Sequence, residues 1–172
     1  SMRELARQVD YSPAGLYEYF GGKDEIIAAV CLEGDSRLAA YLSAVPTDLP
    51  LQEYLIELGL AYVRFARQNR EHFTVLFTNR TPGMTRLPDD HDVTHPADSF
   101  SILLHAIKTG IADGRIVSEV GYSAVEISYS MWAVVHGMAT LQVSYLRDLV
   151  LDFETADRRT LELFVSGLTQ QR

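Results

Sequence analysis

Two short helical segments separated by a tight break occupy the first twenty residues, and this spacing constrains the chain more than any other feature. The apolar positions of residues 2–9 suit a short helix. Asp10 interrupts that pattern. Ser12 is a favourable N-cap, and Pro13 follows at the first helical position, where its missing N–H costs nothing. We therefore expect a second short helix over residues 13–20.

The apolar residues of the two segments predict how they pack. Leu16 and Phe20 lie four residues apart, and we expect them to face Leu5 and Val9 of the first helix. Two helices joined by a turn of about three residues form a helix-turn-helix, whose second helix enters the major groove of DNA. Residues 21–22, both glycine, end the second helix before a longer one begins.

These residues resemble the DNA-binding domain of the tetracycline-repressor (TetR) family of transcriptional regulators. The family pattern is Leu/Ile-Ala-x-x-Ala-Gly-Val-Ser-x-x-x-Leu-Tyr-x-His/Tyr-Phe-x-x-Lys-x-x-Leu. The turn departs from it, because Asp10 and Tyr11 stand where the family carries Gly-Val. Aspartate tolerates a left-handed backbone better than most residues, so the turn can form. The matches in register are Leu5, Ala6, Ser12, Leu16, Tyr17, Tyr19, Phe20 and Lys23, with Ile26 at the final apolar position.

The resemblance implies DNA contacts on and around the second helix. Ala14 and Gly15 carry no hydrogen-bonding side chain, so direct reading of bases by this helix should be thin. The alternatives are a Ser12 that only caps the helix, a Tyr17 in the core and a Lys23 that is merely solvated. The implied contacts are Tyr17, Tyr19 and Lys23 to phosphates, Ser12, Pro13, Ala14 and Gly15 facing base edges, and Arg3 to a phosphate or a base.

The charge of this region argues against tight DNA binding by the 172-residue chain. Residues 1–30 hold three Arg or Lys against five Asp or Glu, whereas a DNA-contacting face should be basic. The family places one more helix, often basic, before Met2. We therefore expect the 172-residue form to bind DNA poorly or not at all. We predict that residues 1–30 are a partial helix-turn-helix domain and residues 31–172 a helical ligand-binding and dimerisation domain.

The rest of the chain has helical periodicity and no strand pattern of useful length, which predicts an all-α fold. Residues 80–96 hold three prolines and should form a loop. A helix that is apolar nearly all round is buried on more than one side, and the run 122–147 is of this kind. The resemblance implies a homodimer in which helices 122–147 and 153–169 pair with their copies as a four-helix bundle. The other expected helices are 24–45, 51–68, 70–79 and 97–113.

A second motif lies in the longest apolar run. Trp132-Ala-Val-Val-His136-Gly137 resembles the Trp-x-x-x-His-Gly motif of a group of TetR-like C-terminal domains. Gly137 permits close approach by another helix. His136 is either a core histidine held by one or two hydrogen bonds or a ligand contact, and each aromatic residue could be plain core. We predict an effector pocket whose ligand-binding residues are Tyr62, Phe65, Phe73, Phe77, Phe100, Leu104, Tyr129, Trp132 and His136.

Composition restricts the compartment and the partners. The single cysteine, Cys31, cannot form an intramolecular disulfide, which suits a cytoplasmic protein. No run approaches the roughly 18 apolar residues of a membrane span, and no signal peptide is visible, so we expect no membrane partner. The net charge is −8, of which residues 31–172 carry −6. This larger part is therefore not a nucleic-acid surface.

No motif for catalysis or cofactor binding is present. The sequence lacks a phosphate loop, a nucleotide-binding glycine pattern and a G-x-S-x-G motif. The five histidines are scattered, and no nucleophile–base pair can be proposed. The acidic, histidine-containing stretch 89–95 has no zinc spacing, so we expect a solvated loop there and no metal. We predict a protein that is not an enzyme and needs no cofactor.

Together these features predict a one-component repressor that an apolar small molecule releases from operator DNA. The dimer would hold two recognition helices about one DNA turn, ~34 Å, apart. An effector that fits another arrangement would change this spacing, with a typical coupling of about 1–3 kcal/mol. The alternative is a helical small-molecule-binding or protein-interaction module that no longer reads DNA, which the acidic residues 1–30 favour. A further alternative is a helical enzyme. It would need an acid–base pair with strongly shifted pKa values inside a cleft, and the sequence offers no such pair.

Overall fold

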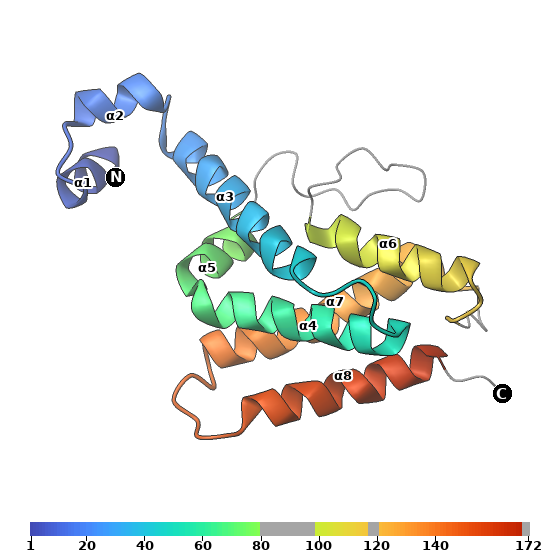
Figure 1. Ribbon diagram of the computed structural model, residues 1–172. Coiled ribbons are helices and arrows are strands. Elements are labelled where there is room, and N and C mark those ends of the chain that lie inside the picture. Colours follow the sequence, from blue (N-terminus) through green and yellow to red (C-terminus); the bar gives the residue numbers. More distant parts are fainter. Residues whose placement is uncertain (80–98, 117–120, 170–172) are drawn as a thin grey trace.

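The computed structural model of the chain describes residues 1–79, 99–116 and 121–169, and in these ranges it contains eight α-helices and no strand (Figure 1). The predicted all-α fold is confirmed. The loop predicted over residues 80–96, including the stretch 89–95, lies outside the described residues. The helices are α1 Met2–Gln8, α2 Pro13–Tyr19, α3 Lys23–Ser43, α4 Leu51–Gln68, α5 Arg70–Thr78, α6 Ser99–Ala112, α7 Ala124–Val143 and α8 Phe153–Thr169.

Helix α7 is shorter than the apolar run 122–147 predicted. It begins at a capping box, in which Ser123 and Glu126 exchange hydrogen bonds, and it ends at Val143. Ser144 leaves the helical conformation and donates its hydroxyl to the carbonyl of Thr140 at 2.5 Å, a local bond that competes with helix continuation. Of the two apolar side chains of the run beyond this point, Tyr145 is 88% exposed and Leu146 is only partly buried. Hydrophobicity alone therefore overestimated the helix.

Helix α4 is the centre of the helical body. It packs against α3, α5, α6, α7 and α8, and its Leu55 and Phe65 are fully buried. A Cβ atom at Gly59 would lie 2.7 Å from Cδ2 of Leu161 and 3.2 Å from Cγ1 of Val135. The missing side chain at Gly59 therefore lets α7 and α8 approach the backbone of α4 directly.

Polar contacts fasten α8 to its neighbours. Arg158 pairs with Glu53 at 3.0 Å and with Glu57, both on α4. On the α7 side, the Nε2 of Gln142 donates to both carboxylate oxygens of the buried Asp157, at 2.9 and 3.0 Å. The Oε1 of Gln142 is buried and has no hydrogen-bond partner among the residues that the structure describes. Burial raises the pKa of the Asp157 carboxyl, opposed by the Gln142 hydrogen bond and by the charge of Arg67.

Helices α1 and α2 form a small head that projects from the body on α3 (Figure 1). The two helices pack against each other, with Ala6 fully buried between them and with Leu16 and Phe20 partly buried as predicted. Val9 was expected in the same interface but is 55% exposed. It is the C-cap of α1, so it has left the helical phase that would have turned it inward.

The predicted boundary between residues 30 and 31 lies inside the continuous helix α3, which spans 21 residues. The predicted boundary therefore divides one continuous helix, and the head is joined to the start of that helix through residues 20–22. None of the helices in the described part of the chain is long and apolar enough to span a membrane.

Candidate DNA-binding and effector sites

The turn between α1 and α2 has the geometry that the sequence predicted. Asp10 adopts a φ of +55°, the left-handed region that glycine usually occupies. Ser12 caps α2 by accepting the backbone N–H of Gly15 at 2.9 Å, and Pro13 stands in the first turn. The N–H of Tyr11 donates to the carbonyl of Ala6 at 2.8 Å and closes the turn. The helix-turn-helix therefore forms despite its departure from Gly-Val.

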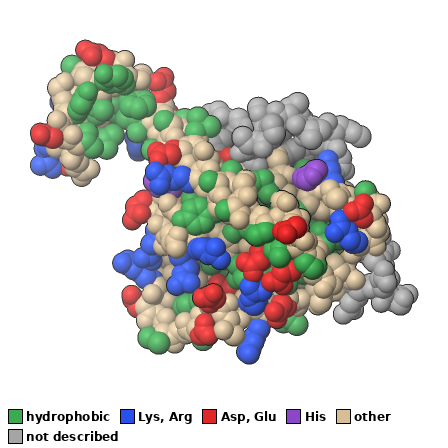
Figure 2. All heavy atoms as spheres, in the orientation of Figure 1, with side chains coloured by type: hydrophobic (Ala, Val, Ile, Leu, Met, Phe, Trp, Pro, Cys, Tyr) green, Lys and Arg blue, Asp and Glu red, His purple; other side chains and the backbone are tan. Residues whose placement is uncertain are grey.

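The predicted DNA-contacting residues form the outer surface of the head. Tyr17 and Tyr19 are 55% and 69% exposed, so neither is a core aromatic. Gly15 is half-buried. Hydrophobic side chains gather on the visible face of the head (Figure 2). The remaining predicted contacts, all exposed, are Arg3, Ser12, Pro13, Ala14 and Lys23.

Tyr11, which stands in the turn where the family carries Val, is a surface residue. A Cβ atom at Gly15 would lie 3.0 Å from Cε1 of the Tyr11 ring, so this ring lies against the first turn of α2. The ring is half-exposed. The sequence signal for this contact was a large residue in the turn followed by a glycine four positions later.

Part of the acidity of the head has structural roles. Glu25 accepts the backbone N–H of Gly21 at 2.8 Å and so fixes the junction between α2 and α3. Glu4 pairs with Arg7 on the exposed side of α1, at 2.5 Å. The surface is therefore less repulsive to DNA than the number of acidic residues alone indicates.

Six of the nine predicted effector-pocket residues meet in one aromatic group. Their rings come from four helices, and each ring has at least one neighbour with a centroid distance of 6.1 Å or less, except Tyr62, which contacts Phe73 and Phe77 at 6.2 Å. The shortest centroid distance, 4.7 Å, joins Phe77 and His136. The aromatic group consists of Tyr62 from α4, Phe73 and Phe77 from α5, Phe100 from α6, and Trp132 and His136 from α7.

The other three predicted pocket residues lie outside this group. Phe65 is fully buried and stacks edge-on against Tyr41 at 5.6 Å. Leu104 is buried in α6, one turn beyond Phe100. Tyr129 is 54% exposed, although it lies about one helical turn before Trp132 on α7. The helical periodicity of α7 identified the face that carries Trp132 and His136. It did not indicate how far along α7 this face contacts other rings.

A chain of hydrogen bonds runs through the aromatic group. The indole N–H of Trp132 donates to the Tyr62 hydroxyl at 3.2 Å, and that hydroxyl lies 2.9 Å from Nδ1 of His136. Burial raises the pKa of Tyr62, so the phenol keeps its proton. Burial lowers the pKa of His136, so the imidazole is neutral at neutral pH. His136 thus has one hydrogen bond, as expected of a core histidine, and within the described part of the chain its Nε2 makes none.

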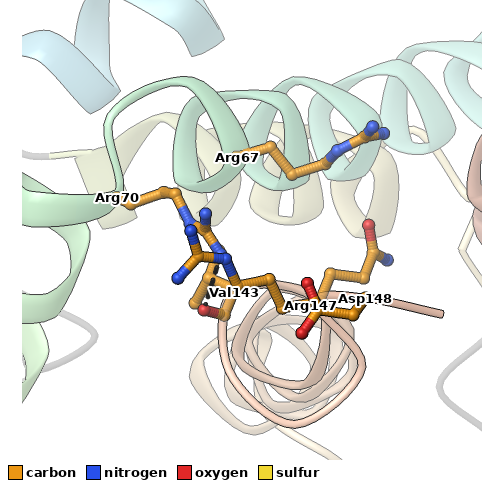
Figure 3. A pocket seen from close by; sticks show the side chains of 6 residues that line it. Arg67, Arg70, Val143, Arg147 and Asp148 are labelled. Atoms are coloured by element: carbon orange, nitrogen blue, oxygen red, sulfur yellow. Dashed lines mark hydrogen bonds between the residues drawn. The ribbon is translucent and has the colours of Figure 1, made fainter.

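A pocket of about 220 Å³ lies elsewhere, where α4 meets α5 and where α7 ends (Figure 3). Its walls are mainly polar, and Arg70 is held there by donating to the carbonyl of Val143 at 2.9 Å. Such walls suit water or a polar molecule rather than an apolar effector. The lining residues are Arg67, Arg70, Gln142, Val143, Arg147 and Asp148.

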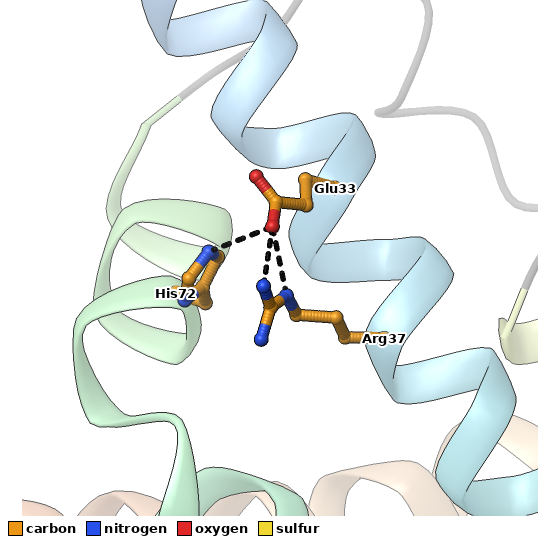
Figure 4. A network of polar contacts seen from close by, with 3 residues as sticks. All are labelled: Glu33, Arg37 and His72. Carbon is orange, nitrogen blue, oxygen red and sulfur yellow. Dashed lines mark hydrogen bonds and ion pairs between the residues drawn. The ribbon is translucent and has the colours of Figure 1, made fainter.

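Helix α5 connects the aromatic group to the helix that carries the head. Glu33 on α3 is bonded by Arg37 at 2.6 Å and lies 3.8 Å from Nε2 of His72 on α5 (Figure 4). The Arg37 hydrogen bond and charge, with a smaller effect of His72, lower the pKa of the Glu33 carboxyl. Cys31 donates to the carbonyl of Val75 at 3.8 Å, so this buried thiol is part of the same contact. Sequence reasoning missed this junction because its residues lie about 40 positions apart.

Two family comparisons match the chain over separate ranges. Residues 1–30 match the family described as bacterial regulatory proteins, tetR family. Residues 55–166, more than half of the chain, match the family described as tetracyclin repressor-like, C-terminal domain. No curated protein matches the sequence.

Several solved structures share the fold. A protein of unknown function from Rhodococcus sp. RHA1 has a TM-score of 0.74 and 22% identity, over 99% of this chain and 85% of that one. The TetR family regulator PfmR from Thermus thermophilus has a TM-score of 0.64 and 20% identity, over 99% and 90%. A TetR variant from Acinetobacter baumannii AYE, in complex with minocycline, has a TM-score of 0.63 and 18% identity, over 97% and 83%.

The helix-turn-helix head and the helical body together define a DNA-binding transcriptional regulator. The chain belongs to the TetR family. Members of this family are transcription factors rather than enzymes.

Proposed function

We propose that this regulator is a cytoplasmic repressor that contacts operator DNA through α2 and the start of α3. The exposed Tyr17, Tyr19 and Lys23 would contact phosphates, while the first turn of α2 faces base edges. Because Ala14 and Gly15 offer no side-chain hydrogen bond, the operator would be recognised largely through its backbone and its shape.

We further propose that an apolar small molecule binds against the aromatic group and weakens DNA binding. The observation that carries this proposal is the convergence of six rings from α4, α5, α6 and α7, four of them only partly buried. Apolar and aromatic walls with few polar groups are typical of small-molecule sites. The Acinetobacter baumannii TetR, complexed with minocycline, supports a small-molecule effector in this fold.

The route from the effector to DNA would run through α5. One side of this helix supplies Phe73 and Phe77 to the aromatic group, and the other side contacts α3 at Cys31, Glu33 and Gly34. A ligand that displaces these phenylalanine rings would shift α5 against α3. Since α2 is joined to the start of α3 through residues 20–22, where Glu25 accepts the N–H of Gly21, that shift would re-aim α2 and change the distance between the two recognition helices of a dimer.

The proposed dimer would form through the outer faces of α7 and α8. A Cβ atom at Gly137 or Gly167 would meet no atom within 4 Å in the described part of the chain, so the helix expected to approach Gly137 would belong to a second copy. Leu163 is 77% exposed on α8. Sedimentation should show a dimer that Gly137→Arg converts into folded monomers, while Ala112→Arg, on the exposed end of α6, leaves it dimeric.

The repressor proposal is tested with DNA enriched from a randomised double-stranded library. Bound DNA, followed by fluorescence anisotropy, is titrated with apolar compounds while the emission of Trp132, the single tryptophan, is recorded. The proposal expects compounds that quench Trp132 and also release DNA. Compounds that quench Trp132 and leave the DNA affinity unchanged would contradict it.

The second candidate is a helical ligand-binding or interaction module that no longer reads DNA. The observation that favours it is the acidic balance of residues 1–30, three basic against five acidic side chains. Failure of the protein to enrich any DNA sequence would select this alternative.

A further inference from the structure

The aromatic group contains one hydrogen-bonding position whose polarity can be derived. Phe73, Phe77 and Phe100 have no polar side-chain atom. The Trp132 indole can only donate, and it does so to the Tyr62 hydroxyl. The remaining question is which way the proton points between Tyr62 and His136.

Burial of Tyr62 decides the direction of that hydrogen bond. The residue is only 5% exposed, so its hydroxyl proton needs a partner inside the protein. Its oxygen already accepts from Trp132, and the imidazole Nδ1 lies 2.9 Å away. If Nδ1 carried a proton, the Tyr62 hydroxyl would receive two donors and its own proton would be left unpaired. Tyr62 therefore donates to Nδ1.

A neutral imidazole that accepts at Nδ1 carries its proton on Nε2. In the part of the chain that the structure describes, Nε2 of His136 makes no hydrogen bond, and the imidazole is only partly buried. The aromatic group thus offers a ligand one donor and no unused acceptor.

From this arrangement we infer that the effector is an uncharged, largely aromatic or apolar molecule with a carbonyl-type oxygen that accepts the Nε2–H of His136. A ligand that brought an N–H or O–H to this position would lose its hydration without gaining a partner. A carboxylate would be desolvated beside a neutral ring, which is costlier still. This inference rests on the proposed effector site and specifies its chemistry.

Three probes with nearly the same ring system test which polar group the site accepts. 9-Fluorenone carries a hydrogen-bond acceptor, carbazole carries a donor, and fluorene carries neither. Affinities are measured by calorimetry and by quenching of Trp132. The wild-type chain should bind 9-fluorenone about fivefold to tenfold more tightly than fluorene, the ratio expected for one neutral hydrogen bond. Carbazole should bind no more tightly than fluorene.

His136→Phe keeps a ring and removes the donor, so the preference for 9-fluorenone should vanish while fluorene still binds. Tyr62→Phe removes the hydroxyl that donates to Nδ1 of His136, so the imidazole proton is no longer held on Nε2. The preference for 9-fluorenone should therefore fall as well. Nitrogen-15 chemical shifts of the wild-type imidazole, which require no variant, should show the proton on Nε2.

Each outcome has a distinct meaning. Equal binding of the three probes, tighter binding of carbazole, or a proton on Nδ1 would overturn the inference while leaving an apolar effector site in place. If none of the probes binds, both this inference and the proposed effector site fail.

Discussion

The head of this regulator has a specific sequence motif and a small buried core, whereas the body has a weaker motif and a large buried core. The head, α1 and α2, matches a specific sequence motif but buries little: Ala6 is enclosed, while Tyr17 and Tyr19 lie outside. The body has a weaker motif but a core centred on α4, with Leu55 and Phe65 fully buried. In a head that contacts DNA, surface chemistry limits which residue types are acceptable. In a body whose helices pack against α4, side-chain volume sets that limit.

The largest expected effect tests this contrast with one substitution in each region. Leu55→Ala removes a fully buried side chain and should cost about 2–5 kcal/mol of unfolding free energy. Leu16→Ala, in the half-buried interface of the head, should leave the main thermal transition nearly in place and abolish DNA binding. Calorimetry and DNA titration of both variants would show this. Equal loss of thermal stability in the two variants would mean that head and body unfold as one unit.

A gain in stability is expected from Asp157→Asn. The new amide can accept from Gln142 and also donate to its Oε1, the buried atom without a partner among the described residues, which should add about 1 kcal/mol. Asp157→Ala is the matched control and should destabilise, since both polar groups of Gln142 then lose their chance of pairing.

The pH dependence of this gain follows from the pKa of Asp157, which burial raises above 3.8. Below that pH the carboxyl is protonated in both the folded and the unfolded state. As the pH rises through the raised pKa, the unfolded state releases its proton more readily, and the wild type loses stability. The advantage of Asp157→Asn should therefore grow from pH 3 to pH 7. A constant difference across this range would refute the assigned cause.

A smaller effect is expected from His136. Burial lowers its folded pKa below 6.5, so the unfolded state binds the proton first as the pH falls. Stability should decline from pH 7 toward pH 5, and His136→Gln, which can still accept from Tyr62, should flatten the decline. Chemical denaturation of the wild type and of His136→Gln at several pH values measures the two slopes, and equal slopes would contradict this cause.

The smallest effect is expected at the surface of the body. Arg158→Ala removes both ion pairs to Glu53 and Glu57, but the Arg158 side chain is 38% exposed. Exposed ion pairs contribute about 0–1 kcal/mol. A loss well above 1 kcal/mol in urea denaturation would show that α8 depends on this contact rather than on its buried apolar side chains.

The sequence predicted local structure well where one residue type has one physical role. Ser12 as a cap and Asp10 at a positive φ were both foreseen from their chemistry. Helical phase also brought six of the nine pocket candidates together. It misplaced Val9 and lengthened α7, because apolar side chains at a helix end can face outward as readily as inward.

What the sequence could not supply was the pairing of distant residues. The contact of Cys31 and Glu33 with α5, and the bond from Tyr62 to His136, join positions 39 to 74 residues apart. Nothing in the local pattern around these residues marks them as partners. These contacts depend on how α3, α5 and α7 pack around α4, which only the three-dimensional structure describes.

The proposed binding of DNA by α2 and the start of α3 is tested by DNA affinity measured as a function of salt concentration. With library-selected DNA, Lys23→Ala should lower affinity and reduce the slope of log affinity against log salt by about 1. Tyr17→Phe should lower affinity, and Arg64→Ala, on the exposed side of α4, should change neither quantity. If Lys23→Ala and Tyr17→Phe bind DNA as tightly as the wild type with the same salt slope, the proposed DNA contacts are wrong.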